Sequence, residues 1–506
     1  MLYAYDHYII NTKGETSLMS ERGTYPGRLR QSIARQWKLI MLSVLIAALI
    51  LVGVFTILPR QQPTRAAPPS GDWLTYMNGN ARQGYNGAET VINATSAPHL
   101  KLHWTAKVGG NVFSQPVVAN GTIYWGSLDG YENATNLNGA LLWHQFLGAR
   151  ATCSPLPSLG VVSTATVATA SINGTPTSVV FVGGGDDHVY ALNAATGTVI
   201  WSTELADPAT NAFIWDSPLV YNNSVYIGTA TTGEPKCKVV PAALFKLNAA
   251  TGSIQNIFTT TPPGCNGAGI WTTPAVDTQD GSIYITTGTE GSFTTCKEPY
   301  AIALVKLSSS DLTVLDHWQI PVTQRGPDSD WGATPTLFQA TIGGVPHNLV
   351  GAVDKNGTYY AFDRASLGSG PIWTATIAVA GECPQCGQGS ISSSAWNGTT
   401  LFVAGGNTTT LSGKSCKGSF QALDPASGAP KYQRCLADGP VIGAVTAVPG
   451  VAAIIAGPNL LLISTVTGKT LFTSKGSGFT FYGSPSISNG VLYVGSKNKA
   501  LYAYGT

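Results

Sequence analysis

The sequence predicts an all-β fold, and two observations carry this prediction. In the stretch from His188 to Leu205, two alternating apolar runs flank an Asn-Ala-Ala-Thr-Gly turn. Alternation places every second side chain on one face of a strand, so the stretch predicts two antiparallel strands joined by a tight turn. The second observation is that this unit recurs along the chain. Its turns lie at Asn136–Gly139, Asn193–Gly197, Asn248–Gly252, Ser308–Asp311, Asp363–Gly370, Asp424–Gly428 and Thr465–Gly468.

The composition agrees with many short strands and turns. The chain has 506 residues, with 58 Gly, 30 Pro and only 4 Met. Glycine and proline favour turns, and a repeat fold of this length can form one body. Charged residues make up 11% of the chain and the formal net charge is +2, so no nucleic-acid partner is expected.

The repeat spans about 40–55 residues, which is typical of the four-stranded blades of a β-propeller. The sequence predicts eight antiparallel blades over residues 71–506, with seven as the alternative count. The last copy is one strand short, and the stretch near 100–107 has the composition to supply it, which would close the ring. The predicted blades are 111–149, 150–208, 209–263, 264–323, 324–380, 381–437, 438–476 and 477–506.

Two further positions recur in the repeat. An aromatic residue follows the turn glycine by four positions at Trp143, Trp201, Tyr432 and Phe472, and we expect these rings to pack between blades. Six of the predicted blades also open on a short strand that begins with Ser or Thr close to Pro. The openings are Ser114 to Pro116, Ser154, Ser217, Thr273, Thr334 and Ser484.

The amino-terminal segment predicts a membrane anchor. Residues 39–58 are 20 residues without a charge, long enough as one transmembrane helix to span a hydrocarbon core of roughly 30 Å. Six basic residues precede this stretch, so residues 1–38 are expected to be a cytoplasmic tail and the remainder to lie on the extracytoplasmic side of the cell membrane. Residues 59–70 form a Pro-rich linker. A cleaved export signal is the alternative.

The eight cysteines agree with export, because all follow residue 58 and an even number suits a disulfide framework. In four-stranded blades, the second-to-third and fourth-to-first loops emerge on the same face, and all eight cysteines fall in such loops. The natural local pairs are Cys237–Cys265 and Cys416–Cys435. Cys383 and Cys386 form a CxxC motif, which we interpret as a structural disulfide rather than a redox or zinc pair.

Four residues on that face are candidates for chemistry. Glu234 and Asp330 are acids, Trp271 is an aromatic platform, and Lys355 is a cation on a tight Asn-Gly turn. Together they suit a flat polyanionic cofactor bound with Ca²⁺. Taken singly, each has a structural explanation as a solvated acid, a core indole, a turn residue or a surface charge.

Three stretches carry a resemblance to a known family. They are Gly71–Gly87, Gly267–Thr289 and Asp328–Phe338. These stretches and the repeats resemble the pyrroloquinoline-quinone (PQQ) repeat family of eight-bladed quinoproteins, and among them the dehydrogenases of the polyvinyl-alcohol and methanol or ethanol type. The resemblance extends over nearly all of residues 71–506, although the repeat motifs by themselves specify only the fold.

The resemblance implies a role for each candidate. It implies that Trp271 forms the floor under PQQ, that Glu234 binds Ca²⁺, and that Asp330 is both a Ca²⁺ ligand and the catalytic base. Lys355 matches the cation bonded to the quinone oxygens and would assist catalysis. The family's asparagine ligand for Ca²⁺ is replaced by Thr289, with Glu290 beside it as a substitute.

A second departure concerns the cysteines. Many relatives have an adjacent-cysteine disulfide above PQQ, whereas this sequence has a lone Cys153 followed by Ser154.

The resemblance implies oxidation of a small alcohol or a hydroxyl-bearing polymer. A separate electron acceptor is expected, because the sequence has no CxxCH haem-attachment motif. The alternative is a non-catalytic propeller that serves as a protein-binding or assembly scaffold, since some anchored relatives bind no PQQ. A sugar hydrolase would need two carboxylates across a cleft, and acids are sparse.

Overall fold

The computed structural model describes residues 71–151, 153, 158–231, 237–291, 296–326, 328–411, 414–474 and 483–506. The chain forms two compact units, Met1–Ala67 and Pro68–Thr506, and the described residues all belong to the second. The predicted tail, membrane segment and linker therefore lie outside the described residues. Within the described part, we find no helix with the length and apolar character needed to cross a bilayer.

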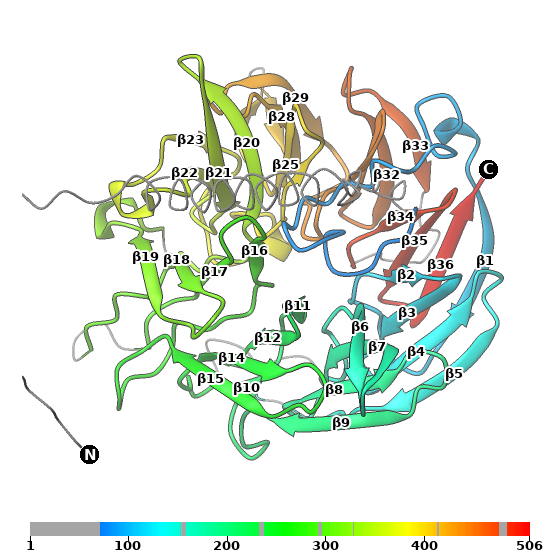
Figure 1. Cartoon of the computed structure of the whole chain (residues 1–506). Coiled ribbons are helices and arrows are strands. Elements are labelled where there is room, and N and C mark those ends of the chain that lie inside the picture. The colour runs from blue at the N-terminus through cyan, green and yellow to red at the C-terminus, as the bar shows by residue number, and fades with distance from the viewer. Residues whose placement is uncertain are drawn as a thin grey trace, which may run out of the picture. The chain divides into compact units, whose positions relative to one another are not determined.

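The second unit is a ring of eight four-stranded antiparallel sheets arranged around a centre (Figure 1). This confirms the predicted eight-bladed β-propeller. Blade 1 contains β2 (Val117–Ala119), β3 (Thr122–Gly126), β4 (Tyr131–Asn136) and β5 (Leu141–Phe146). Blade 2 contains β6 (Thr166–Ile172), β7 (Thr175–Gly183), β8 (His188–Asn193) and β9 (Val199–Glu204). Blade 3 contains β11 (Leu219–Tyr221), β12 (Ser224–Gly228), β14 (Ala243–Asn248) and β15 (Ile254–Thr259). Blade 4 contains β16 (Ala275–Asp277), β17 (Ser282–Thr286), β18 (Ala303–Ser308) and β19 (Val314–Gln319).

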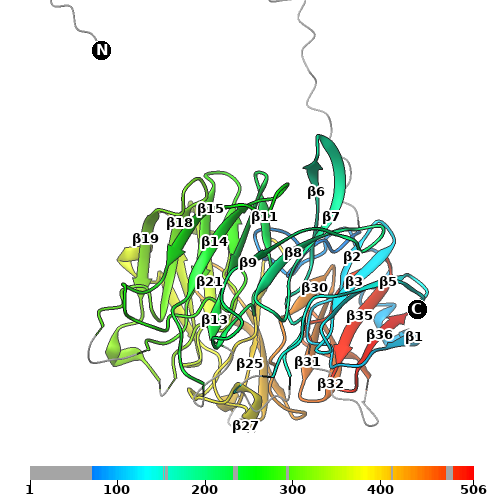
Figure 2. The same ribbon diagram turned by 90° about the horizontal axis from the view of Figure 1, so that it is seen from below.

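The β6–β7 hairpin of blade 2 extends beyond the ring on one face (Figure 2). Blades 5 to 8 repeat the same arrangement of four strands. Blade 5 contains β20 (Thr336–Ile342), β21 (Val345–Val353), β22 (Thr358–Asp363) and β23 (Trp373–Thr376). Blade 6 contains β24 (Ala395–Trp396), β25 (Leu401–Gly405), β28 (Gly418–Leu423) and β29 (Pro430–Leu436). Blade 7 contains β30 (Thr446–Val448), β31 (Val451–Ala456), β32 (Asn459–Ser464) and β33 (Thr470–Ser474). Blade 8 contains β34 (Ser486–Ser488), β35 (Val491–Ser496), β36 (Ala500–Gly505) and β1 (Lys101–Lys107). The loops contain the paired strands β10 (Ala212–Phe213) and β13 (Ala230–Thr231), the paired strands β26 (Thr408–Leu411) and β27 (Lys414–Cys416), and the 3₁₀ turns η1 (Ala97–His99), η2 (Val322–Gln324), η3 (Leu367–Ser369) and η4 (Pro384–Cys386).

The ring closes as the sequence predicts. β1 pairs antiparallel with β36, from Lys101 opposite Gly505 to Lys107 opposite Ala500. The outermost strand of blade 8 therefore comes from the start of the described chain, and its inner three strands come from the end. This pairing covers the edge of β36, which would otherwise be the outer strand of a three-stranded blade.

Burial follows the position of a strand in its blade. β31 and β36 are buried at every residue, whereas in the outer strand β5 only Trp143 is buried. The predicted aromatic packing is confirmed at Trp143 and Trp201, whose indole Nε1 groups donate to the carbonyls of Ala194 and Ala249 in the next blade, at 3.1 Å each. Gly197 has a φ of 72°, and a Cβ there would lie 2.6 Å from Trp143, so only glycine fits beneath the ring.

The inner strands are linked by hydrogen bonds between side-chain hydroxyls and backbone N–H groups. The residue two positions before the inner strand is Gln, Thr, Ser or Ala in the eight blades. In six blades its N–H donates to the hydroxyl at the same position of the next blade, and we call these six bonds the hydroxyl ring. Ser154, predicted to open blade 2, lies outside the described residues, and Thr164 occupies this position instead. The bonds run from Gln115 to Thr164 (2.8 Å), Thr164 to Ser217 (3.0 Å), Ser217 to Thr273 (3.1 Å), Thr273 to Thr334 (3.0 Å), Thr334 to Ser393 (3.0 Å) and Ala444 to Ser484 (2.8 Å).

The segment Gly71–Asn86, which we call the plug, crosses the centre of the ring and contacts every blade. It hydrogen-bonds the second residue of each inner strand, and its Trp73, Met77 and Arg82 are completely buried. The bonded strand residues are Val118, Val167, Val220, Val276, Leu337, Trp396, Ala447 and Ile487.

We expect the hydroxyl ring to contribute measurably to stability. Thr273→Val keeps the side-chain volume but leaves the buried N–H of Ser217 without an acceptor, which should lower the free energy of unfolding by about 1–3 kcal/mol. Urea denaturation followed by tryptophan fluorescence measures this change. Thr175→Val, at an exposed strand position, is the control and should change stability by less than about 0.5 kcal/mol. Equal effects of the two substitutions would contradict the role of the ring.

Candidate functional site

The cysteine-bearing loops form one face of the ring, and their disulfides differ in part from the prediction. The predicted Cys416–Cys435 pair and the structural disulfide Cys383–Cys386 are confirmed. The predicted Cys237–Cys265 pair is wrong. The two remaining disulfides are Cys153–Cys237 and Cys265–Cys296.

Isolated backbone bridges connect the segments that carry three of these cysteines. Gly267 forms an isolated bridge with Glu290, and the N–H of Ala268 donates to the carbonyl of Thr289 at 2.7 Å. Gly267 also bridges Pro241, and its N–H donates to the carbonyl of Val240 at 3.0 Å. The segment after Cys265 is therefore aligned both with the segment before Cys296 and with the segment after Cys237. Cys237 is bonded instead to Cys153, which lies in an earlier loop of the chain.

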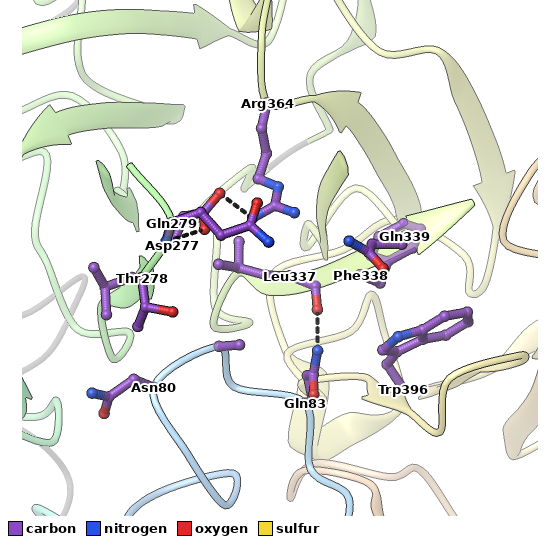
Figure 3. A pocket seen from close by; sticks show the side chains of 12 residues that line it. Asn80, Gln83, Asp277, Thr278, Gln279, Leu337, Phe338, Gln339, Arg364 and Trp396 are labelled. Carbon is purple, nitrogen blue, oxygen red and sulfur yellow. Dashed lines mark hydrogen bonds and ion pairs between the residues drawn. The ribbon is translucent and has the colours of Figure 1, made fainter. Parts of the chain in front are cut away.

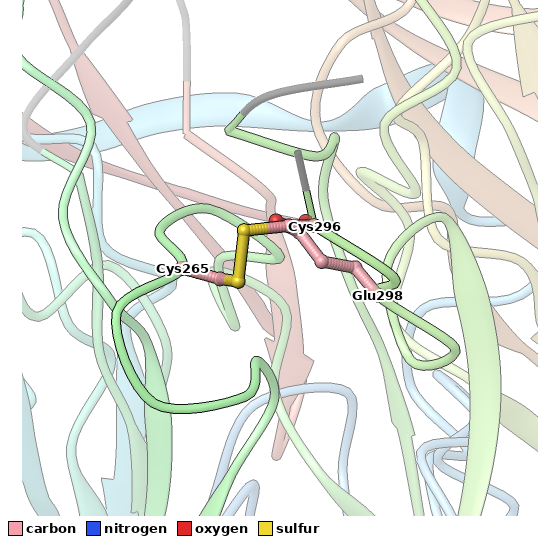
Figure 4. Close-up of side chains that lie close together, drawn as sticks. All are labelled: Cys265, Cys296 and Glu298. Carbon is pink, nitrogen blue, oxygen red and sulfur yellow. A yellow bond between two sulfur atoms is a disulfide. The ribbon is translucent and has the colours of Figure 1, made fainter. Parts of the chain in front are cut away.

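Cys265, Cys296 and Glu298 lie close enough to suggest a metal site (Figure 4). Both sulfur atoms are joined in a disulfide and so cannot act as thiolate ligands. Glu298 is 5% exposed, and burial raises the pKa of its carboxyl. This cluster therefore has no soft-metal donor set and is a structural crosslink.

The structure brings three of the predicted site residues together. Asp330 lies in the loop before β20, and Lys355 lies in the tight turn between β21 and β22. Lys355 Nζ contacts Asp330 Oδ2 at 2.9 Å and Asp328 Oδ2 at 2.8 Å. The same Nζ lies 5.3 Å from the centroid of the Trp271 ring, in the segment before β16. Glu234 lies outside the described residues.

The backbone fixes these side chains from several sides. The N–H of Thr289 donates to Asp330 Oδ1, and the N–H of Lys355 donates to the carbonyl of Asp330 at 3.2 Å. A Cβ added at Gly332 would lie 2.5 Å from Trp271 Cη2, so the backbone of residue 332 packs directly against the half-buried indole. The ammonium, the carboxylates and the indole are therefore held by different blades and loops at one place.

The suggested substitute ligand Glu290 is already engaged in an ion pair. Its Oε1 and Oε2 atoms accept from Arg325 Nη1 at 2.8 and 3.1 Å. Thr289 reaches Asp330 through its backbone N–H, whereas the resemblance assigns it a side-chain role. A cation bound here would therefore depend on the two aspartates more than on residues 289 and 290.

Sequence reasoning missed two acids at this site. Asp328 precedes Asp330 by two residues and shares its lysine, and Asp354 immediately precedes Lys355 and is completely buried. The Asp-Ser-Asp spacing was a signal for the first, since residues two apart in an extended segment point to the same side. Nothing in the sequence distinguished Asp354 from an ordinary turn acid.

Burial and neighbouring charges set the protonation states. Burial favours a lower pKa for Lys355, but the charges of Asp330 and Asp328 outweigh it and raise this pKa above its ordinary value. Burial, followed by the charge of Asp330, raises the pKa of Asp328. Burial raises the pKa of Asp354 well above its usual range. At neutral pH the site therefore combines an ammonium with closely spaced carboxyl groups.

This donor set fits the implied cofactor in part. The aspartate oxygens of residues 328 and 330 are hard ligands of the kind Ca²⁺ prefers, and the exposed part of Trp271 offers a surface for a planar ring. Lys355 is the cation available to a polyanionic ligand, although its ammonium is shared by both carboxylates.

A comparison with models of protein families identifies the family to which the chain belongs. A family model described as "Outer membrane protein assembly factor BamB", of the PQQ-repeat type, matches residues 133–429. The chain belongs to the PQQ-repeat β-propeller family. This match confirms the resemblance inferred from the repeats, and it concerns the family and its fold.

Two curated relatives of this chain are named as dehydrogenases. The polyvinylalcohol dehydrogenase of Sphingopyxis sp. (strain 113P3) is 26% identical over 345 residues, covering 58% of this chain and 50% of the relative. The quinohemoprotein alcohol dehydrogenase ADH IIB of Pseudomonas putida is 23% identical over 343 residues, covering 58% and 46%. The chain thus spans about half the length of these curated relatives. It is a quinoprotein-like propeller distantly related to PQQ alcohol dehydrogenases.

Solved structures agree on the fold. A europium-containing methanol dehydrogenase has a TM-score of 0.70 and 16% identity, covering 87% of this chain and 99% of that chain. The quinohemoprotein alcohol dehydrogenase from Comamonas testosteroni has a TM-score of 0.69 and 17% identity, covering 87% and 81%. At such identities the likeness concerns the propeller and not the chemistry.

We expect Lys355→Met to destabilise the protein in a pH-dependent way. Without the ammonium, the buried carboxylates of Asp328 and Asp330 repel each other, which should cost about 3–5 kcal/mol at pH 7.5. Burial and the charge of Asp330 would then hold the folded-state pKa of Asp328 above the unfolded value of about 3.9, so the deficit should grow as pH rises through and above that value. Urea denaturation at about pH 4.5 and 7.5 measures it.

The exposed Lys431→Met is the control, because Lys431 bonds only a carbonyl and a hydroxyl of the same blade. It should change stability little at either pH. A Lys355→Met deficit that does not shrink toward acidic pH would contradict the charge assignment.

The disulfides should differ in their contribution to stability because they close loops of different length. Cys153 and Cys237 are 84 residues apart, whereas Cys383 and Cys386 are 3 apart. Chain-entropy arguments give about 4–5 kcal/mol for the long loop and about 1–2 kcal/mol for the short one. Thermal unfolding of the two Cys→Ser double variants should rank them in this order, and the reverse order would show that native-state contacts dominate.

Proposed function

We propose that this protein is a membrane-anchored, extracytoplasmic quinoprotein that oxidises an alcohol group with PQQ and Ca²⁺. The observation that carries this proposal is the convergence of Trp271, Asp330 and Lys355 at one place, although 84 residues separate the first from the last in the sequence. Distant similarity to polyvinylalcohol and alcohol dehydrogenases supports the same chemistry.

Each residue has a definite task in this proposal. Trp271 would stack against the planar cofactor, and Lys355 would bond its oxygen atoms. Asp328 and Asp330 would supply oxygen ligands to the cation, together with Glu234. When bound, PQQ supplies an electrophilic carbonyl that accepts a hydride, and Ca²⁺ strengthens that electrophilicity.

Asp330 is the proposed general base. Its Oδ1 atom accepts the N–H of Thr289 and its Oδ2 atom accepts from Lys355, so the carboxylate is fixed in one orientation. A base held in place can take the hydroxyl proton of an alcohol as the hydride leaves the carbon. The two electrons would pass to a separate acceptor, because the sequence contains no haem-attachment motif.

The substrate class and the location are also proposals. We infer a small alcohol or a hydroxyl-bearing polymer as substrate, since the relatives are named for alcohols and polyvinyl alcohol. We infer a single-pass anchor at residues 39–58 with the amino terminus inside, because of its apolar length and the basic residues before it. The four disulfides suit an oxidising compartment.

The test is a titration of the purified protein with PQQ in the presence of Ca²⁺, followed by tryptophan fluorescence and quinone absorbance. Trp271→Ala should weaken PQQ binding at least about tenfold, because the stacking surface is lost. Asp330→Asn should lower alcohol-dependent dye reduction by about 10²–10⁴-fold. The half-buried Asp316→Asn in β19 is the control and should leave both quantities unchanged.

A non-catalytic binding platform is the second candidate. It is favoured by the family model, which is described as an assembly factor, and by the complete pairing of the Lys355 ammonium with two carboxylates. Failure of the wild-type protein to bind PQQ at any Ca²⁺ concentration would support this candidate and remove the enzyme.

A further inference from the structure

Figure 3 shows the residues that line a polar cavity. The cavity lies at the opposite end of the inner strand of blade 4 from Trp271. Trp271 precedes β16 by four residues, and Asp277, which ends β16, lines the cavity. The cavity encloses about 320 Å³, at the lower end of the range for small-molecule sites. Its wall is built from the plug, the β16–β17 turn, β20, β24 and Arg364, which follows β22.

An ion pair forms the charged part of this wall. Arg364 Nη1 contacts Asp277 Oδ2 at 2.5 Å, and each residue is only 8% exposed. Asp277 Oδ1 accepts the N–H of Gln279 at 3.0 Å, so both carboxylate oxygens are occupied. Among the described residues, neither Nη2 nor the buried Nε of Arg364 has a hydrogen-bond partner. The pair therefore contributes no net charge but retains unused N–H donors.

Amide side chains supply most of the remaining polar groups. Each of three amides uses its NH₂ group in a hydrogen bond to the protein, and within the described part of the chain its carbonyl oxygen has no partner. Gln279, on the exposed β16–β17 turn, adds a fourth amide. The three bonds run from Asn80 to the Val220 carbonyl, from Gln83 to the Leu337 carbonyl and from Gln339 to Asn348 Oδ1, each at 2.9 Å.

We propose that this cavity binds a neutral polyol. A hydroxyl group can donate to an amide oxygen and accept from Arg364 in the same position, and the C–H surface of a polyol can pack against Leu337 and Trp396. An anion would meet the carboxylate of Asp277, and a cation would meet the guanidinium of Arg364. Asp277 and Arg364 are the only charged residues of the lining, so neither sign of ligand charge is compensated.

Two sources offer this chemistry, a saccharide unit and a segment of a linear hydroxylated chain. The site does not rest on the proposed enzyme function, because the plug and the hydroxyl ring separate the cavity from Trp271 along the inner strands. Binding here should therefore be the same with and without PQQ.

Saturation-transfer NMR and calorimetry on the wild-type protein test the proposal. The probes are maltose, a short poly(vinyl alcohol) oligomer, and the charged analogues glucuronate and glucosamine. We expect millimolar binding of one or both neutral probes, at least about fivefold tighter than either charged analogue. Preference between maltose and the oligomer decides the source. Absence of neutral binding, or equal binding of the charged analogues, would overturn the proposal.

Variants locate the binding. The double substitution Gln279→Ala and Gln339→Ala removes two exposed amides without touching the buried ion pair, and it should weaken the neutral ligand about 5–10-fold. Gln145→Ala, on the outer strand β5 of blade 1, is the matched control and should not change the affinity. Equal affinity in the double variant and the wild type would place the ligand elsewhere and overturn the assignment. PQQ titration of the double variant should match that of the wild type.

Discussion

The hydrogen bonds between the inner strands and the plug are the constraint on which the remaining structure depends. An inner strand of three residues, such as β2 or β16, cannot pair on its central side with another strand of its own blade. The N–H and carbonyl groups on its central side would be buried at the centre of the ring without hydrogen-bond partners. The plug satisfies a backbone group of the second residue of every inner strand, and the hydroxyl ring joins most neighbouring blades two residues earlier. Eight separate sheets thereby share one centre.

This centre also fixes where the two polar sites lie. Along blade 4, Trp271, Thr273, Val276 and Asp277 follow one another, and they belong in turn to the candidate cofactor site, the hydroxyl ring, the plug contact and the polyol cavity. The register of one short strand therefore sets the separation between the sites. Blade 5 behaves similarly, because Asp330 precedes β20 while Leu337 and Gln339 within β20 line the cavity.

The candidate cofactor site depends on a balance of charge. Lys355 contacts the carboxylates of Asp328 and Asp330, whose charges outweigh the effect of burial and raise the pKa of its ammonium. Such an arrangement is suited to exchange, since a divalent cation can take over the carboxylates and a polyanionic ligand can take over the ammonium. The same charges also balance one another when no ligand is bound. The arrangement is therefore compatible with an enzyme and with a binding platform, and both occur on one fold.

The sequence by itself determined the architecture. Period-2 alternation, the recurring turn glycine and the repeat length specify eight blades, and the strand at Lys101–Lys107 was recognised as the closing strand because blade 8 was one strand short. These are local properties, and their repetition favours eight blades over the alternative count of seven. Trp271, Asp330 and Lys355 were candidates by residue type and by position in the predicted blades. Resemblance to a family implied their roles, and the structure brings them together.

Only the tertiary structure decided the rest. The Cys153–Cys237 and Cys265–Cys296 pairs join loops that are separate in the sequence, and no spacing of cysteines encodes them. The roles of Asp328 and of the plug, and the pairing of Asp277 with Arg364, depend on contacts between segments far apart in the chain or in different loops. Local patterns set the strands because side-chain alternation is a property of neighbouring residues. Sites and crosslinks form between blades, and so they are set by the closure of the ring.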